Sequence, residues 1–363
     1  MNEATETGEN MANTDTDTDA EAIAESESPA SAEDLLAGRK RTPAERIQHV
    51  LHGNPALSPF IVLVLAIIVF AIASPGFMRP QALSLLVQEM AVVGTLAVGQ
   101  TVIILTAGID LSIGLAMVLT SLVMVKLVYD QSLPGLLALL IGGVVAVATG
   151  GFNGLLVTRL NLPPFIVTLG SFGIFTAVSL LYAQGQTIAL DPNSLLLWTG
   201  KSFSIGSFTV TYGVLLMLVL YAIVGFALHY TAWGRHLYAT GDDAEAAQLA
   251  GIKTKRVLLS AYLVAGFTVA VAAWVVCGRV GGADPNSGLN VNLLSITAVV
   301  IGGTSLFGGR GVVVGSLIGA LIVQVFNNGL ALADVDPNYQ VLATGVLVIV
   351  AVSVDQWIRR VKA

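Results

Sequence analysis

Polar side chains inside long apolar stretches are the first residues of this sequence that can do chemistry. The candidates for a solute path are Glu89, Gln100, Gln324 and Asn327, with Gln88, Asn153 and Asn328 in similar positions. A polar residue inside an apolar segment is costly in lipid, so it is a functional candidate by default. An amide side chain can hydrogen-bond a hydroxylated solute, and it can equally bond a neighbouring helix. Glu89 lies near the end of its segment, where water can reach it.

No pattern typical of a catalytic, metal or cofactor site occurs in the sequence. Paired carboxylates and zinc-type histidine spacing are missing from the apolar segments, and no Gly-x-x-x-x-Gly-Lys-[Ser/Thr] phosphate loop is present. The glycine-rich stretch Gly302–Gly311 lacks the Lys-[Ser/Thr] pair, so we interpret it as a tight turn with Arg310 at an interface. The single cysteine, Cys277, cannot form an internal disulfide. We expect neither an enzyme nor a cofactor-binding protein.

The composition predicts that lipid surrounds most of the chain. Of 363 residues, 55% are hydrophobic and only 11% are charged, whereas soluble domains carry roughly 25% charged residues. A membrane-spanning helix needs about 20 mostly apolar residues. Ten apolar segments meet or approach this length: Leu57–Ala73, Ser84–Leu105, Leu111–Val128, Leu136–Leu156, Phe165–Tyr182, Tyr212–His229, Leu258–Cys277, Leu293–Ile301, Val312–Phe326 and Val341–Val354. The expected fold class is all-α, a polytopic membrane helix bundle with about ten transmembrane helices.

Lysine and arginine positions predict the orientation of these segments, because cytoplasmic loops are enriched in positive charge. If the N-terminus is inside and the segments alternate, thirteen basic residues fall on the inner side and four on the outer side. The outer four are Arg79, Lys126, Lys201 and Arg279. Both termini are therefore expected in the cytoplasm.

The first part of the chain differs from the rest. Residues 1–38 hold 11 of the 23 acidic residues and no Lys or Arg, and the remainder holds 12 acidic and 17 basic residues. A polar, acidic segment buries too little apolar area to offset its chain entropy. We expect residues 1–45 to form a disordered acidic cytoplasmic tail, as a linker or a regulatory segment, and 46–363 to form the transmembrane domain.

One polar stretch, Gly241–Gly251, interrupts the apolar pattern on the predicted inner side. We expect a short helix there, because Asp242 or Asp243 can cap its first turn and Gly251 can end it. A membrane protein that keeps such a helix outside lipid can present it to a partner. A solvated connecting loop is the alternative.

Four ordered motifs resemble the ribose-type sugar permeases of bacterial ATP-binding-cassette (ABC) importers. They are Gly99–Gly114, Leu162–Gly170, the Gly241–Ile252 loop, and Gly302–Gly311 followed by Asn327-Asn328-Gly329-Leu330. The similarity runs from about residue 57 to the C-terminus and leaves out the acidic tail. In the loop, the residues that match the family's ATPase-coupling helix are Gly241, Asp243, Glu245, Ala246, Ala247, Leu249 and Gly251.

The resemblance implies a monosaccharide importer in the bacterial inner membrane. Its expected partners are two cytoplasmic ABC ATPase subunits (or one fused tandem ATPase), an extracytoplasmic sugar-binding protein and a second permease subunit that forms a homodimer with this one. Membrane lipid is also an expected partner, and nucleic acid is not. The long outer loops Asp191–Gly206 and Arg279–Asn292 are the candidate surface for the binding protein. Asp110 either caps the following helix or contributes to a gate or an ATPase contact.

Two other functional classes remain as alternatives. An ion-coupled secondary transporter usually places ionisable residues or broken helices near the bilayer midplane, and such residues are nearly absent from the segment centres here. An intramembrane enzyme is disfavoured because His49, His52, His229 and His236 all lie at or outside the predicted inner face.

Overall fold

The computed structural model describes residues 57–360, and the expected acidic tail therefore lies outside the described residues. Helices dominate, and the strands are two- to four-residue pairings in loops. The helices are α4 (Leu57–Ala73), α5 (Pro80–Leu105), α6 (Ile113–Tyr129), α7 (Gly135–Arg159), α8 (Pro164–Ala183), η1 (Leu195–Gly200), α9 (Tyr212–Tyr230), α10 (Ala232–Asp242), α11 (Ala244–Leu249), α12 (Thr254–Val280), α13 (Leu289–Ile301), α14 (Val313–Leu332) and α15 (Pro337–Arg360). The strands are β1 (Ile188–Ala189), β2 (Ser202–Ile205), β3 (Phe208–Thr211) and β4 (Gly282–Ala283).

Six of the described helices are long and apolar enough to cross a membrane: α5, α7, α8, α9, α12 and α14. The segments Leu57–Ala73, Ile113–Tyr129 and Asn290–Ile301 are shorter apolar helices. Apolar side chains on the outer faces are strongly exposed; Ile72, Val144 and Leu181 are 80%, 71% and 78% exposed. Because so large an apolar surface is unfavourable in water and favourable in hydrocarbon, the chain is a multi-pass, all-α membrane protein.

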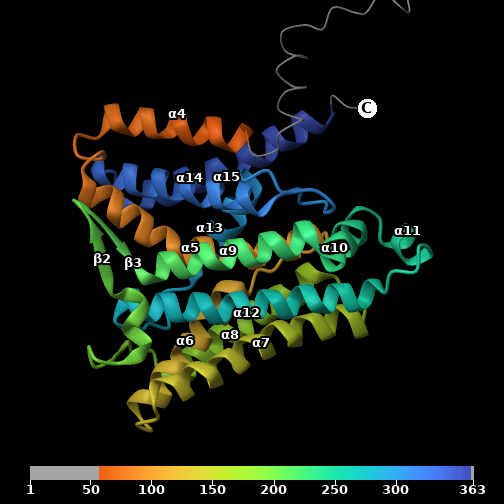
Figure 1. The fold of residues 1–363 in the computed structure, drawn as a ribbon, viewed down its shortest axis with the longest axis horizontal. Helices are drawn as coiled ribbons and strands as arrows, with labels where there is room; N and C mark the ends of the chain where they lie inside the picture. Colours follow the sequence, from red (N-terminus) through yellow and green to blue (C-terminus); the bar gives the residue numbers. More distant parts are fainter. Residues whose placement is uncertain (1–56, 361–363) are drawn as a thin grey trace, which may run out of the picture. The chain divides into compact units, whose positions relative to one another are not determined.

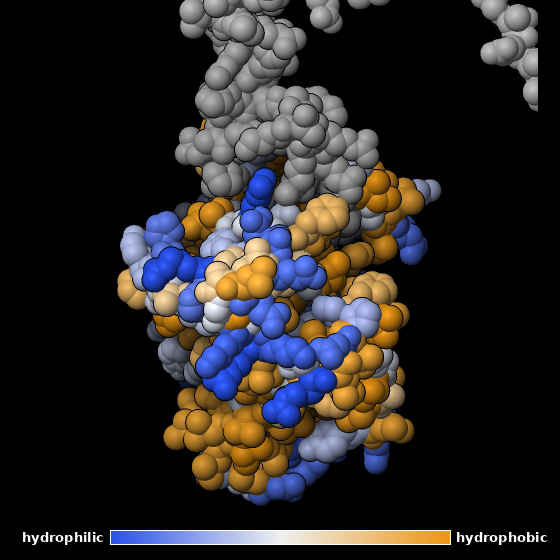
Figure 2. Space-filling model, turned by 90° about the vertical axis from the view of Figure 1, so that its right-hand side faces the viewer, coloured by the Kyte–Doolittle hydropathy of each residue, from blue (hydrophilic) through white to orange (hydrophobic). Residues whose placement is uncertain are grey.

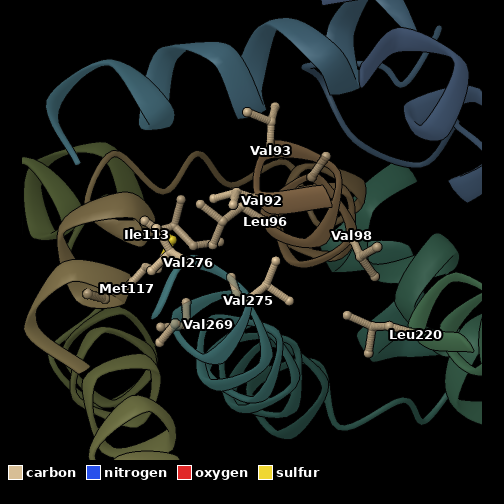
Figure 3. Close-up of a cluster of buried hydrophobic side chains, with 14 of the residues drawn as sticks. Val92, Val93, Leu96, Val98, Ile113, Met117, Leu220, Val269, Val275 and Val276 are labelled. Carbon is tan, nitrogen blue, oxygen red and sulfur yellow. The ribbon is translucent and has the colours of Figure 1, made fainter. Parts of the chain in front are cut away.

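Helix α5 lies at the centre of the bundle and contacts α9, α12, α13 and α14. From Met90 to Leu105 every residue of α5 is buried. Figure 3 shows Val92 and Leu96 of α5 among side chains of the neighbouring helices. Those neighbours include Ile113 and Met117 of α6, Leu220 of α9, and Val269, Val275 and Val276 of α12.

Small residues allow α12 and α7 to touch through their backbones. A Cβ added at Gly150 would lie 2.3 Å from the carbonyl oxygen of Tyr262, and one at Gly266 would lie 2.6 Å from that of Ala146. In lipid, helix association depends on this kind of close approach. The two glycines therefore set the spacing of the most extensive helix pair in the bundle.

The bundle has two distinct ends, seen at the left and right of Figure 1. The hairpin end carries the β2–β3 hairpin and the β1–β4 pairing, in which Ile188 lies opposite Ala283. At the other end, which we call the α11 end, the chain leaves α9, forms α10 and α11, and returns into α12. Figure 2 views the α11 end and shows hydrophilic side chains gathered across its middle, with hydrophobic side chains at the margins.

Candidate functional site: the α11 end and the polar residues of the bundle

Two helices separated by a sharp break form the polar stretch at the α11 end. Helix α10 begins at the Thr231 cap, whose hydroxyl accepts a hydrogen bond from the Gly234 amide at 3.3 Å. It ends where Asp243 adopts extended backbone angles, φ −152° and ψ 106°. The short helix expected between Gly241 and Gly251 is therefore found as α11, which starts at Ala244, and Gly241 belongs to the last turn of α10.

Helix α11 is only six residues long and depends on its caps. The Asp243 carboxylate accepts hydrogen bonds from the amides of Glu245 and Ala246, both at 2.9 Å, so Asp243 rather than Asp242 is the cap. At the other end Gly251 has a φ of +86°, which favours glycine. The Gly251 amide donates to Gln248 and the Ile252 amide donates to Ala247, each at 3.0 Å. This pair of bonds is a Schellman motif, which confirms Gly251 as the helix stop.

The predicted docking residues divide into an exposed set and a buried set. Glu245, Ala246 and Leu249 are exposed, and Leu249 is 91% exposed although it is apolar. Gly241 and Ala247 are buried against the chain itself. The surface that α11 offers to a partner is therefore an acidic side chain, a small side chain and one leucine.

A hollow of about 460 Å³ lies between α10, the end of α11 and the start of α12. Its lining includes Trp233, whose indole donates to the Ser260 hydroxyl at 2.8 Å. The basic side chains His236, Lys253 and Arg256 also line it. Lys253 and Arg256 lie at the start of the membrane-spanning helix α12, a position where positive side chains are typical of a membrane interface.

The turn between α5 and α6 holds a buried polar network. The Asp110 carboxylate accepts hydrogen bonds from the Ser112 amide and the Ser112 hydroxyl, both at 2.7 Å. Asn153 of α7 donates to the Ser112 hydroxyl at 2.9 Å and accepts from the Ser171 hydroxyl of α8 at 2.5 Å. Burial raises the pKa of the Asp110 carboxyl, and the hydrogen bonds from Ser112 and Asn153 lower it. Asp110 thus organises the turn that leads into α6 and links three helices.

The four solute-path candidates do not converge on one site within the described residues. Gln100 is fully buried, and its amide can pair with both backbone groups of Asp110. Glu89 forms an ion pair with Arg279 at 2.8 Å near the hairpin end. Gln324 is buried in α14, and Asn327 accepts a hydrogen bond from Thr344 of α15 at 3.4 Å. Helix bonding thus occupies Gln100, Glu89 and Asn327, and Gln324 alone among these four has no hydrogen bond in the described structure.

The loops at the hairpin end pack on one another through aromatic rings. Trp198 stacks on Tyr212 and on Trp274, with centroid separations of 4.7 and 5.6 Å. These loops were expected to form the surface for the binding protein, but neither strand pairing was predicted from the sequence. No local pattern reports that Ile188 and Ala283 pair, because 95 positions separate them in the chain.

One group of contacts at the α11 end was not found from sequence at all. The amide of Gly309, in the loop between α13 and α14, donates to the Leu105 carbonyl at the end of α5 at 3.0 Å. Tyr238 of α10 donates from its hydroxyl to the Gly311 carbonyl at 2.7 Å. The signal in the sequence was the glycine spacing of Gly302–Gly311, which predicted a turn but not its partners.

Comparison with known proteins places this architecture in a family. The family model described as "Branched-chain amino acid transport system / permease component" matches residues 82–352. A fructose import permease protein of Rhizobium meliloti is 46% identical over 328 residues, covering 89% of this chain and 91% of that protein. A ribose import permease protein of Bacillus subtilis (strain 168) is 36% identical over 301 residues, covering 83% and 92%.

A third relative is named for another sugar. The D-allose transport system permease protein of Escherichia coli (strain K12) is 32% identical over 308 residues, covering 83% of this chain and 91% of that protein. The resemblance to ribose-type permeases, stated above from four motifs, is confirmed. The chain belongs to the family of transport-system permease components to which these sugar import permeases also belong.

Proposed function

We propose that this chain is the permease subunit of an ABC importer that carries a monosaccharide inward across the bacterial inner membrane. The observation that carries the proposal is the 46% identity to a fructose import permease over nearly the whole of both chains. Fructose is the first sugar to test, and ribose and allose follow from the other relatives.

Within this proposal, ten helices cross the bilayer: α4 to α9 and α12 to α15. The path of the chain supports this count, because successive helices end alternately at the α11 end and at the hairpin end. The α11 end then faces the cytoplasm, together with both termini. The positive charges of Arg159 in the last turn of α7, Arg235 in α10 and Lys255 in the first turn of α12 support this orientation.

Helix α11 serves as the element on which a cytoplasmic ATPase docks. Support comes from a polar helix fixed by a cap at each end, with Glu245 and Leu249 turned away from the bundle. Two ATPase subunits or one tandem ATPase, an extracytoplasmic sugar-binding protein at the hairpin end, and a second copy of this chain complete the importer. Sugar hydroxyls need only weak, transient partners along the path, because a tight site would hinder release.

Uptake into proteoliposomes tests the proposed function. The permease, its ATPase and its binding protein are reconstituted together, and labelled fructose uptake is measured with and without ATP. We expect uptake only when all three components and ATP are present. Uptake by the permease alone, driven by a proton or sodium gradient, would instead identify a secondary transporter.

The variant Glu245→Lys tests the docking role in the same system. Reversing an exposed charge on α11 leaves the bundle core intact, so we expect normal membrane insertion with ATP-dependent uptake reduced at least tenfold. Gln248→Lys, which changes a neighbouring exposed position outside the family pattern, is the control. Normal uptake by Glu245→Lys with the ATPase still bound would remove Glu245 from the docking surface.

A further inference from the structure

We propose that a glycine-packed junction, made by Leu105, Gly241, Gly308 and Gly309, transmits movement from α10 and α11 to the central helix α5 and to the α13–α14 loop. Tyr238 is the positioning residue that holds this junction together. The inference rests on the proposed function and adds to it the route by which force at α11 reaches the bundle.

Three separate parts of the chain meet at the junction with no space between them. A Cβ added at Gly241 of α10 would lie 1.8 Å from the Leu105 carbonyl oxygen and 2.8 Å from the Gly309 amide nitrogen. A Cβ at Gly308 would lie 2.5 Å from the Gly241 carbonyl oxygen, and one at Gly309 would lie 2.7 Å from the Cα of Asp242. Only glycine fits at these positions, so backbone touches backbone directly.

Direct backbone contact makes the junction suitable for transmitting displacement. Flexible side chains between two elements can change rotamer and absorb a shift, whereas close-packed backbones cannot. The α13–α14 loop is itself braced, since the Ser305 amide donates to Arg310 at 2.8 Å and the Gly308 amide donates to Ser305 at 3.1 Å. A shift of the last turn of α10 must therefore move the loop, the end of α5, or both.

Two hydrogen bonds fasten the junction. The Gly309 amide bonds the Leu105 carbonyl, one of the helix-terminal carbonyls of α5 that the helix itself cannot satisfy. The Tyr238 hydroxyl bonds the Gly311 carbonyl at 2.7 Å. Burial raises the pKa of Tyr238 above its ordinary value, so the hydroxyl stays protonated and remains a donor.

Tyr238 is the one side chain of α10 that joins the helix to the α13–α14 loop by a hydrogen bond in the described structure. Without this bond only packing holds α10 against the loop, so the coupling between them weakens while both elements keep their own fold. Buried hydroxyls of Thr240 in α10 and Thr304 beside the loop also lack partners among the described residues. Unpaired buried hydroxyls are uncommon. These two hydroxyls can form hydrogen bonds when the junction moves.

The test compares Tyr238→Phe with Tyr230→Phe in reconstituted importer with its ATPase and binding protein. Tyr230 lies at the end of α9, is 68% exposed and makes no hydrogen bond in the described structure, so its variant is the matched control. The measured quantity is sugar transported per ATP hydrolysed. For Tyr238→Phe we expect this ratio to fall about fivefold, the change in population produced by losing one hydrogen bond of ordinary net strength, with ATP hydrolysis and complex assembly preserved.

Other outcomes overturn the inference. An unchanged ratio in Tyr238→Phe shows that the bond transmits nothing, and an equal fall of hydrolysis and uptake shows a structural role alone. Gly309→Ala, which strains a φ of +66° and overlaps Asp242, supplies a second variant with the same expected fall in the ratio. If the wild-type importer shows no ATP-dependent uptake, that result overturns the proposed function itself, which distinguishes it from a failure of the junction alone.

Discussion

At the scale of single residues, the described structure assigns different tasks to two adjacent aspartates. Asp243 accepts two amide hydrogen bonds at the start of α11, whereas Asp242 makes no side-chain hydrogen bond in the described structure. Sequence alone left the choice between them open, because either can cap a helix from its position. The extended backbone of Asp243 decides the matter, since a cap residue needs non-helical angles.

Asp243→Ala is expected to destabilise α11 by about 1 kcal/mol, the usual cost of losing a helix N-cap. Because α11 has only six residues, this loss unfolds it locally and reduces ATP-dependent uptake, while the bundle remains folded. Uptake and thermal unfolding of the purified importer are the measurements. Asp242→Ala is the control, and an equal loss of uptake in both variants would contradict the capping role.

Asp110 illustrates how a buried carboxyl group is held by its neighbours. Removing its side chain leaves the buried amide and hydroxyl of Ser112 without an acceptor, which costs roughly 1–3 kcal/mol for each unsatisfied group. We therefore expect Asp110→Ala to lower the melting temperature clearly in detergent.

Asp110→Asn provides the comparison, because its side-chain oxygen can still accept from Ser112. Burial disfavours the charged form of Asp110 and raises its pKa, so the neutral amide is expected to keep the melting temperature close to that of the unaltered protein. Equal destabilisation by alanine and asparagine would show that the charge, rather than the hydrogen bonds, maintains the turn.

At the scale of secondary-structure elements, hydropathy located the helices better than it located their ends. The first helix was predicted from Leu57 to Ala73 and has those bounds. Helix α13 begins at Leu289, four residues earlier than expected, because the polar Asn290 and Asn292 interrupt the apolar run without breaking the helix. Asn292 accepts a hydrogen bond from the Gly114 amide of α6, a distant contact that no local pattern reports.

The candidate site was predictable only in part for the same reason. The caps of α11 follow from neighbouring residues, and sequence identified Gly251 and narrowed the N-cap to Asp242 or Asp243. The burial of Gly241 depends on Leu105 and Gly309, which lie far away in the chain. The sequence therefore placed Gly241 with the ATPase-coupling residues, and its burial in α10 could not be predicted.

Helix packing gives a prediction that compares two glycines of α7. A Cβ at Gly150 would lie 2.3 Å from the Tyr262 carbonyl oxygen, whereas a Cβ at Gly143 would meet nothing within 4 Å. Gly150→Ala must push α7 and α12 apart, and we expect a loss of about 1–3 kcal/mol, typical of overpacking. Thermal unfolding in detergent measures the change, and Gly143→Ala should be neutral or slightly stabilising in a helix.

At the scale of the whole molecule, charge and apolar surface lead to one arrangement in the membrane. Exposed apolar side chains surround the bundle, and most basic residues of the described chain lie at the α11 end. Lys126 and Arg279 form ion pairs with Asp130 and Glu89, and both lie toward the hairpin end. A concentration of Lys and Arg at one end of the bundle is what the positive-inside rule predicts for a cytoplasmic α11 end.

Cysteine labelling of intact cells tests this orientation, and the chain is well suited to it. The single native cysteine, Cys277, is fully buried, so the unaltered protein should give little signal with a membrane-impermeant maleimide. Leu249→Cys places a thiol on α11 at a position that is 91% exposed, and Ile205→Cys places one at the hairpin, where Ile205 is 67% exposed. We expect labelling from outside at position 205 only, and labelling at position 249 only after the cells are opened. Because both positions are exposed in the folded chain, access across the membrane alone separates them, and labelling of position 249 in sealed cells would reverse the assigned orientation and remove α11 from any cytoplasmic partner.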